Sequence, residues 1–213
     1  MRSAVRAAPP ALPVSVRTPV LVVAGLGLVV LVVLAVLFAG ESQPTAFDTP
    51  LLPGPDLLPD PWWYIATAVD FVGEPVGSAI VIVLLTGGTL LARRPRTAVL
   101  TLVGCGLTVA VTSLLKPITG RTIHGHFLSY PSGHTAFATA LALIAAFLLA
   151  DRLRRPAALA VTAALALAAA ALMAWAEVGL GAHYPTDTIG GFAAALTIIP
   201  ATALAIDRIA ARL

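Results

Sequence analysis

The sequence predicts an all-α fold, a six-span transmembrane helical bundle with one short interfacial helix in the first external loop. Three observations indicate this: the composition is 59% hydrophobic and 11% charged, the mean hydropathy is +0.96, and long stretches carry no charge. The first two exclude an ordinary soluble domain. The third matches helices, which need about 20 apolar residues to cross roughly 30 Å of hydrocarbon. The uncharged stretches are residues 18–40, 75–92, 97–115, 135–150, 156–176 and 188–206.

The first apolar stretch follows a basic N-terminal segment, residues 1–17, which contains Arg2, Arg6 and Arg17. Cleaved secretory signals have an apolar core of about 7 to 15 residues and a small-x-small cleavage site. This stretch is longer, and no convincing cleavage site follows it. We therefore expect a retained helix, so that residues 18–213 form a single transmembrane domain.

The next connection, residues 41–74, is an external loop rich in proline and acidic residues, without lysine or arginine. Its beginning is expected to be irregular and exposed to water. Between Trp62 and Val72, apolar residues recur at helical spacing. This pattern predicts a short helix at the membrane interface, anchored by Trp62 and Trp63. Plain anchoring is favoured there over a lid for lipid entry.

The basic residues gather in alternate connections between the apolar stretches. An excess of arginine marks the cytoplasmic side, so both termini are expected inside, in a multi-pass protein of the plasma membrane. On the opposite face lie Lys116 and Arg121, beside a histidine-containing segment, which predicts an extracytoplasmic site. No lysine-rich tail or aromatic-basic array indicates nucleic acid. The arginines of the cytoplasmic side are Arg2, Arg6, Arg17, Arg93, Arg94, Arg96, Arg152, Arg154, Arg155, Arg208 and Arg212.

The segment Tyr-Pro-Ser-Gly-His, residues 130–134, stands directly before the fourth stretch. Ser132 is placed to cap that helix, and free N–H groups at a helix N-terminus bind anions. Ser132 and Gly133 therefore suit a phosphate cradle. A turn and a cap alone would explain Pro-Ser-Gly equally well. His134, on the same side as Lys116 and Arg121, favours the phosphate site.

The segment Gly-Ala-His-Tyr-Pro-Thr-Asp, residues 181–187, precedes the sixth stretch. The four-residue spacing of His183 and Asp187 allows the carboxylate to reach the imidazole, whether or not the segment is helical. A carboxylate in that position fixes the tautomer of the ring and stabilises its positive charge. His183 is therefore a candidate nucleophile. The alternative is a capping Asp187 beside an interfacial His183.

With these motifs the chain resembles the membrane branch of the type 2 phosphatidic acid phosphatase superfamily, which includes polyprenyl diphosphate phosphatases and glucose-6-phosphatase. The matching features are Lys116 with Arg121, then segment 130–134, then segment 181–187, within roughly residues 75–207. The resemblance implies an integral membrane phosphatase that hydrolyses a lipid phosphate or a polyprenyl diphosphate through a phosphohistidine intermediate.

The resemblance also implies a role for each matching residue. His183 would be the nucleophile, Asp187 would orient it, and His134 would protonate the leaving oxygen. Such a site needs no metal and no other cofactor, because preorganised cations and N–H donors meet the charge that develops in phosphoryl transfer. The groups implied to hold the phosphate are Lys116, Arg121, Ser132 and the Gly133 amide.

The chain departs from the family pattern at two phosphate-binding arginines. In the first motif an arginine normally lies seven residues after the lysine and is followed by proline, where this chain has Ile123 and His124. Arg121 aligns with an arginine often found two positions earlier. In the third motif an arginine normally lies six residues before the nucleophile, where this chain has Glu177. We expect Glu177 to pair with Arg121 or Lys116, or to bind a substrate hydroxyl.

His124 and His126 are accessory candidates, and they bring all four histidines of the chain to one face. Because imidazoles with carboxylates bind zinc, a metal-dependent membrane hydrolase is a minor alternative. Against it, no usual zinc-site spacing occurs, and the charges of Lys116 and Arg121 would oppose a cation. The sequence therefore predicts no metal.

The expected substrate is a membrane lipid, since the site lies near the outer ends of the spans. Phosphatidic acid, phosphatidylglycerol phosphate and a polyprenyl diphosphate such as undecaprenyl diphosphate all fit, and the external orientation favours the polyprenyl carrier. Two other classes stay open. One is a catalytically silent relative that binds a lipid headgroup or a partner. The other is a transporter, which should show charged or broken helices at the midplane; here the polar residues cluster at span ends.

Overall fold

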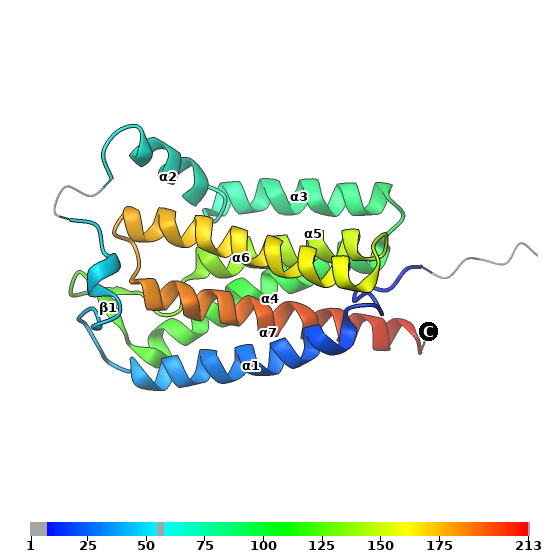
Figure 1. The fold of residues 1–213 in the computed structure, drawn as a ribbon, viewed down its shortest axis with the longest axis horizontal. Coiled ribbons are helices and arrows are strands. Elements are labelled where there is room, and N and C mark those ends of the chain that lie inside the picture. The colour runs from blue at the N-terminus through cyan, green and yellow to red at the C-terminus, as the bar shows by residue number, and fades with distance from the viewer. Residues whose placement is uncertain (1–7, 55–57, 213) are drawn as a thin grey trace, which may run out of the picture.

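The structure is a computed structural model, which describes residues 8–54 and 58–212. It is the helical bundle that the sequence predicts, with one pair of two-residue strands (Figure 1). Arg2 and Arg6 of the basic N-terminal segment, and residues 55–57 of the external loop, lie outside the described residues. The elements are α1 (Arg17–Leu37), η1 (Thr49–Leu51), α2 (Trp62–Asp70), α3 (Pro75–Leu91), α4 (Pro95–Thr119), β1 (Thr122–Ile123), β2 (Phe127–Leu128), α5 (Gly133–Ala150), α6 (Arg155–Gly179) and α7 (Pro185–Ala210).

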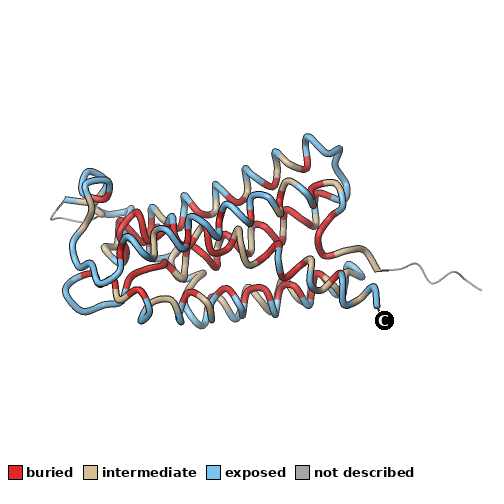
Figure 2. The backbone as a smooth tube through the Cα atoms, turned by 90° about the horizontal axis from the view of Figure 1, so that it is seen from below, coloured by how far each residue is buried: buried red, intermediate tan, exposed pale blue. Residues whose placement is uncertain are grey.

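Five helices, α1, α4, α5, α6 and α7, are each long and apolar enough to cross a membrane. The sixth predicted span corresponds to α3, which meets the same criterion only together with α2, as a pair bent by 60°. Large apolar side chains cover the outside of the bundle, for example Val29, which is 59% exposed. Figure 2 shows exposed residues along the outward side of the long helices. Apolar outer surfaces of this kind match a lipid environment.

The long helices lie side by side along the longest axis of the molecule (Figure 1). Helix α5 is central, because it packs against α4, α6 and α7. Helix α1 packs along α7, α3 packs on α4, and α2 packs on α6. The end of α4, the hairpin of β1 and β2, the start of α5, the end of α6 and the start of α7 therefore meet at one end of the bundle.

Two glycines in the first turns of α7 allow it to approach the residues that precede α5. A Cβ added at Gly191 would collide with the Ser132 carbonyl oxygen, and one added at Gly190 would collide with the ring of Tyr130. Tyr130 is fully buried and donates a hydrogen bond of 2.7 Å to the Leu31 carbonyl of α1. Small residues thus bring the two polar segments predicted from the sequence into contact.

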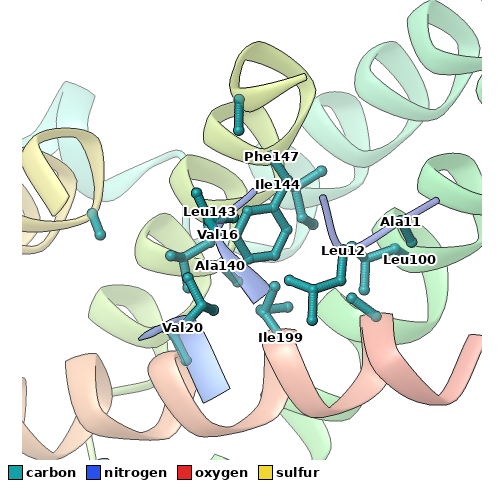
Figure 3. Close-up of a cluster of buried hydrophobic side chains, with 14 of the residues drawn as sticks. Ala11, Leu12, Val16, Val20, Leu100, Ala140, Leu143, Ile144, Phe147 and Ile199 are labelled. Carbon is teal, nitrogen blue, oxygen red and sulfur yellow. The ribbon is translucent and has the colours of Figure 1, made fainter. Parts of the chain in front are cut away.

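The apolar core lies toward the opposite end, where Leu143, Ile144 and Phe147 of α5 are buried among α4, α7 and the N-terminal segment (Figure 3). The segment before α1 belongs to this core, since Leu12 is fully buried. The Leu12 N–H donates a hydrogen bond of 3.0 Å to the Asp207 carboxylate of α7. The end of the basic N-terminal segment is therefore part of the folded domain.

The external loop is irregular at first and then forms α2, as predicted. The expectation that its first half is exposed to water is wrong at Asp48, whose side chain is fully buried. The reason lies elsewhere in the chain: Arg121 is also fully buried, and a buried guanidinium needs a carboxylate partner. The loop supplies that partner from a position 73 residues away.

Candidate active site

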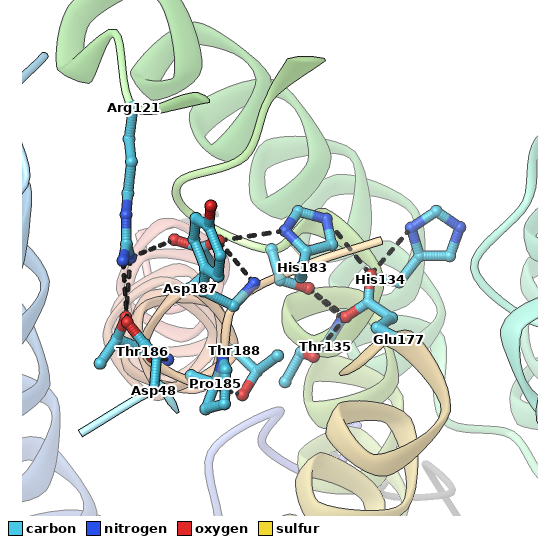
Figure 4. A network of polar contacts seen from close by, with 12 residues as sticks. Asp48, Arg121, His134, Thr135, Glu177, His183, Pro185, Thr186, Asp187 and Thr188 are labelled. Atoms are coloured by element: carbon cyan, nitrogen blue, oxygen red, sulfur yellow. Dashed lines mark hydrogen bonds and ion pairs between the residues drawn. The ribbon is translucent and has the colours of Figure 1, made fainter. Parts of the chain in front are cut away.

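The two polar segments begin helices at the same end of the bundle, which brings their side chains together (Figure 4). Ser132 caps α5 as predicted, because its hydroxyl accepts a hydrogen bond of 3.0 Å from the Thr135 N–H. His134 is then the second residue of α5. Pro185 is the first residue of α7, and its fixed φ suits that position. His183 thus lies in the connection just before α7, opposite His134.

The two imidazoles converge on one carboxylate atom. The Glu177 Oε1 atom lies 3.4 Å from His183 Nε2 and 3.5 Å from His134 Nδ1. Glu177 lies near the end of α6 and is only 1% exposed. The rings therefore lie on either side of a single buried group (Figure 4), as a common site for both histidines requires.

Asp187 lies on the other side of His183. Its Oδ2 atom is 3.6 Å from His183 Nδ1 and accepts a hydrogen bond of 3.0 Å from the Tyr184 N–H. Its Oδ1 atom accepts a hydrogen bond of 2.6 Å from Arg121. The carboxylate is fully buried and held at both oxygens, and it lies beside His183 Nδ1, which makes no hydrogen bond to the described residues. Nε2 of His183 is then the nitrogen that faces His134 and Glu177.

Arg121 lies beyond Asp187 as seen from the histidines (Figure 4). Besides Asp187, its guanidinium donates hydrogen bonds to Thr186 at 2.7 Å and to Asp48 at 3.0 Å. It also stacks on aromatic rings, with its central carbon 4.0 Å from the centre of the Phe38 ring. Arg121, predicted to hold phosphate, is thus already paired with two carboxylates. In this geometry it positions Asp187.

Asp48 is the second carboxylate that pairs with Arg121. Its Oδ1 atom accepts a hydrogen bond of 2.8 Å from the Thr186 N–H, and its Oδ2 atom accepts one of 2.9 Å from the Thr45 N–H. Burial alone would raise the pKa of this carboxyl, but the hydrogen bonds from Thr45 and Thr186 bring the pKa below its ordinary value. Asp48 is therefore a carboxylate that anchors the external loop to α7.

Glu177 is bound by hydroxyl groups as well as by imidazoles. Its Oε2 atom accepts hydrogen bonds from Ser132 and from Thr135, the latter at 2.7 Å. Glu177 was expected to pair with Arg121 or Lys116, or to bind a substrate hydroxyl. The pair with Arg121 does not form, because Asp48 and Asp187 hold Arg121. Instead, Ser132, which was predicted to hold the phosphate, and the two predicted catalytic histidines contact the Glu177 carboxylate.

The remaining predicted residues lie around this centre. Lys116 is half-buried in the last turn of α4, and Gly133 is the first residue of α5. His124 lies at the tip of the β1–β2 hairpin with a positive φ of 52°, and its Nε2 atom is 2.8 Å from the Gly181 carbonyl oxygen. His126 is exposed and lies against the ring of Phe127. His124 thus supports the loop that carries His183, whereas His126 contacts neither of the paired histidines.

Two more carboxylates face His134 from the side of α2. Its Nε2 atom lies 3.9 Å from Asp70 Oδ1 and 3.7 Å from Glu74 Oε1. Gly73 packs directly against the His134 ring, and a Cβ added there would collide with it. Asp70, His134 and Glu177 are the described residues that are close enough to hold a metal ion together.

The chain is thus a multi-pass helical membrane protein that brings two histidines, each beside a carboxylate, together at the ends of its helices. The model of the PAP2 superfamily matches residues 97–210, more than half of the chain, so the chain belongs to the PAP2 superfamily. All four histidines and their partners Glu177 and Asp187 lie inside the matched region. Asp48, Asp70 and Glu74 lie outside it.

A solved structure has the same fold: a crystal structure described as the first transmembrane PAP2-type phosphatidylglycerolphosphate phosphatase, from Bacillus subtilis. The two structures agree with a TM-score of 0.66, over 89% of this chain and 96% of that one, at 20% sequence identity. No curated protein matches the chain. This likeness establishes the fold, and the chemistry rests on the residues of the site.

Sequence reasoning missed four residues that hold the site together: Asp48, Asp70, Thr135 and Thr186. Asp48 and Asp70 lie in a loop with many other acidic residues, and no local pattern separates them from exposed ones. A signal was present for the threonines, since Thr135 directly follows segment 130–134 and Thr186 lies within segment 181–187. An arginine on the disfavoured side of the membrane also indicated that a buried acidic partner was needed.

Proposed function

We propose that this chain is a lipid phosphate phosphatase that forms a phosphohistidine at His183. The observation that carries the proposal is the convergence of His134, His183 and Ser132 on one buried anion, the Glu177 carboxylate. Groups that surround a carboxylate in this way offer a phosphate the same donors at the same place. The PAP2 fold supports the same class of reaction.

The chemistry takes two steps. In the first, His183 Nε2 attacks phosphorus, a P–N bond forms, the bond from phosphorus to the lipid oxygen breaks, and protonated His134 gives its proton to that oxygen. In the second, His134 takes a proton from water, the water oxygen attacks phosphorus, and the P–N bond breaks to release inorganic phosphate. Asp187, beside Nδ1, stabilises the positive charge that develops on His183.

Binding of the phosphate requires Glu177 to leave its present position. A phosphate oxygen then accepts the Ser132 hydroxyl, while Lys116 and the Gly133 amide at the start of α5 supply positive charge. Arg121 acts through Asp187 in this scheme rather than on the phosphate. Because these groups are preorganised, the proposed reaction needs no metal.

A lipid substrate is supported by an apolar groove beside the site. The groove, of about 720 Å³, lies between α2, α5 and α6, and its lining includes Val69 and Val72 on one side and Ala138 and Leu141 on the other. Ala138 is one helical turn after His134, so an acyl or prenyl chain in the groove would end near the reacting atoms. A lipid phosphate or a polyprenyl diphosphate fits this arrangement, and we favour the polyprenyl carrier.

The site is proposed to face away from the cytoplasm. The arginine-rich connections between α3 and α4 and between α5 and α6 lie at the end of the bundle opposite the histidines. Since arginine marks the cytoplasmic side, the histidines would lie at the outer surface of the plasma membrane, and both termini would lie inside.

A second candidate function, favoured by one observation, is a silent relative that binds lipid headgroups. The observation is Glu177 itself, an anion in the position where phosphate would bind. If its carboxylate does not move, phosphate is repelled and no transfer occurs.

One experiment distinguishes the phosphatase from the silent relative. It measures phosphate release by the purified full chain in detergent, with and without a chelator. Phosphatidic acid, phosphatidylglycerol phosphate and a polyprenyl diphosphate are the substrates. We expect metal-free turnover, at least a 10³-fold loss in His183→Ala and about a 10²-fold to 10⁴-fold loss in His134→Ala. His126→Ala, an exposed histidine on the same face, is the matched control and should retain activity. An absence of turnover on all three lipids would favour the silent relative.

A further inference from the structure

A pocket lined by arginines lies at the end of the bundle opposite to the histidines. It is formed by the start of α1, the start of α4 and the end of α7, since α1 and α4 both pack on α7. Figure 1 shows the start of α1 beside the last turns of α7. The pocket has a volume of about 430 Å³, and its lining includes Arg17, Leu21, Arg96, Leu204, Asp207 and Arg208.

Positive charge exceeds negative charge in this pocket. Its lining contributes three guanidinium groups and one carboxylate, from Arg17, Arg96, Arg208 and Asp207. The Asp207 carboxylate also accepts two backbone hydrogen bonds, of 2.8 Å from the Ala11 N–H and 3.0 Å from the Leu12 N–H. This single carboxylate therefore leaves the pocket with a net positive charge.

The arginines are only loosely paired. Arg96 Nη1 lies 3.3 Å from Asp207 Oδ1, and Arg17 Nη2 lies 3.7 Å from Asp207 Oδ2, whereas charge-assisted hydrogen bonds are about 2.7–2.9 Å long. The Nε atom of Arg17 is buried and has no hydrogen-bond partner among the described residues. Arginines at the ends of spans commonly reach out to water, but a buried donor without an acceptor is costly. An acceptor in the pocket would remove that cost.

A phosphate group with an attached acyl chain matches this lining. Guanidinium groups bind phosphate oxygens through parallel hydrogen bonds, and basic pockets between transmembrane helices bind anionic headgroups. Leu21 and Leu204 are partly buried. Each lies four residues from an arginine of the pocket, on the side toward the middle of its helix, which is about one helical turn. A phospholipid covers both the charged and the apolar part, whereas a soluble phosphate covers only the first.

We propose that this pocket binds the headgroup of an anionic phospholipid. The phosphate lies among Arg17, Arg96 and Arg208, and an acyl chain extends along Leu21 and Leu204. The bound lipid joins the starts of α1 and α4 to the end of α7. This site is distant from the two paired histidines and takes no part in the proposed phosphatase reaction.

The test is lipid binding to the purified full chain in a neutral detergent, measured by native mass spectrometry and by thermal unfolding. Dioleoyl phosphatidylglycerol should bind about tenfold tighter than dioleoyl phosphatidylcholine, whose headgroup carries a compensating positive charge. Arg208→Gln should weaken the binding of phosphatidylglycerol roughly fivefold. Its melting temperature without lipid should equal that of wild type, because Arg208 is exposed and makes no ion pair with the described residues.

Arg152→Gln is the matched control, since Arg152 is exposed in the connection between α5 and α6, at the same end of the bundle and outside the pocket. It should bind phosphatidylglycerol as wild type does. Equal affinity for the two lipids, or equal binding by Arg208→Gln and Arg152→Gln, overturns the site. Glycerol phosphate at about 100-fold excess should not displace the lipid, because it leaves the apolar part uncovered. Displacement by glycerol phosphate would overturn the lipid as the ligand and assign the pocket to a soluble phosphate.

Discussion

At the scale of single residues, Glu177 occupies the place where the proposed reaction needs a phosphate. The family pattern has an arginine at this position, and this chain has a buried carboxylate that binds Ser132, Thr135 and both paired histidines. The same donors that would hold a phosphate are therefore satisfied without one. Such an internal anion keeps the buried donors paired, and the proposed reaction requires a substrate phosphate to displace it.

The first prediction follows from the competition between the Glu177 carboxylate and a substrate phosphate for the same donors. Glu177→Gln removes the negative charge but keeps the shape and one acceptor oxygen, so KM for the lipid phosphate should fall about tenfold, because repulsion of the phosphate is lost. Steady-state kinetics and inhibition by inorganic phosphate measure this change. Glu41→Gln, an exposed carboxylate in the external loop, should leave KM unchanged. An unchanged KM in Glu177→Gln would argue against the displacement of Glu177 by substrate.

Asp48 and Arg121 form a second unit, whose role is structural. Asp48→Asn should destabilise the protein by about 3–5 kcal/mol, because it leaves a buried guanidinium with one carboxylate fewer. Thermal unfolding in detergent measures this loss, and Asp60→Asn, an exposed aspartate of the same loop, should unfold as wild type does. Equal melting temperatures for the two variants would mean that the buried pair contributes little.

The buried pair of Asp48 and Arg121 also predicts how the stability of the protein depends on pH. The pKa of Asp48 is lowered in the folded protein from an ordinary value of 3.8. A carboxyl with a lowered pKa contributes stability that is fully present above its unfolded value and is lost as the pH falls through its folded value. Wild type should therefore lose stability below about pH 3.8 more steeply than Asp48→Asn. Unfolding measured between about pH 2.5 and about pH 6 tests the difference.

At the scale of the helices, the close approach of α7 to the start of α5 builds the site. Gly191→Ala should destabilise the protein by about 1–3 kcal/mol, because the added methyl group collides with the Ser132 carbonyl oxygen. It should also lower kcat, since α5 carries His134. Gly106→Ala in α4 is the control: nothing lies near its added Cβ, and alanine favours a helix. Thermal unfolding and phosphate release compare the two, and equal behaviour would contradict the importance of this contact.

Helix α2 does more in the structure than anchor the chain at the membrane interface. The pattern from Trp62 to Val72 predicts an interfacial anchor, and Trp62 does lie at the surface, packed against Trp175 of α6. The helix also lines the apolar groove and ends at Asp70, next to His134. It therefore borders both the proposed path of the lipid and the reacting groups.

At the scale of the whole molecule, the orientation in the membrane is a prediction that labelling can test. Cys105 is the one cysteine of the chain and is fully buried, so it should react little with a thiol reagent. In intact cells a membrane-impermeant thiol reagent should label His126→Cys, in the hairpin beside the site. It should label Arg152→Cys, in the connection between α5 and α6, only after the membrane is opened. The reverse pattern would place the site in the cytoplasm.

Much of the fold could be predicted from the sequence, because the cost of exposed backbone and charge in lipid acts on each span separately. Apolar stretches therefore indicated the helices, and the cap at Ser132 was predicted from three neighbouring residues. The long-range pairs were not predictable in this way. Glu177 was expected to pair with Arg121 or Lys116, or to bind a substrate hydroxyl. Arg121 pairs instead with Asp48, from an acidic loop without distinguishing pattern.

By itself the sequence determined that this is a helical membrane protein, that it carries the two histidine motifs, and that arginine is missing at two expected positions. These are properties of local composition and order. Only the tertiary structure decided which charges meet: Arg121 with Asp48 and Asp187, and Glu177 with His134 and His183. Burial forces each of these groups to find a partner, and the partner depends on which helix ends the packing brings together.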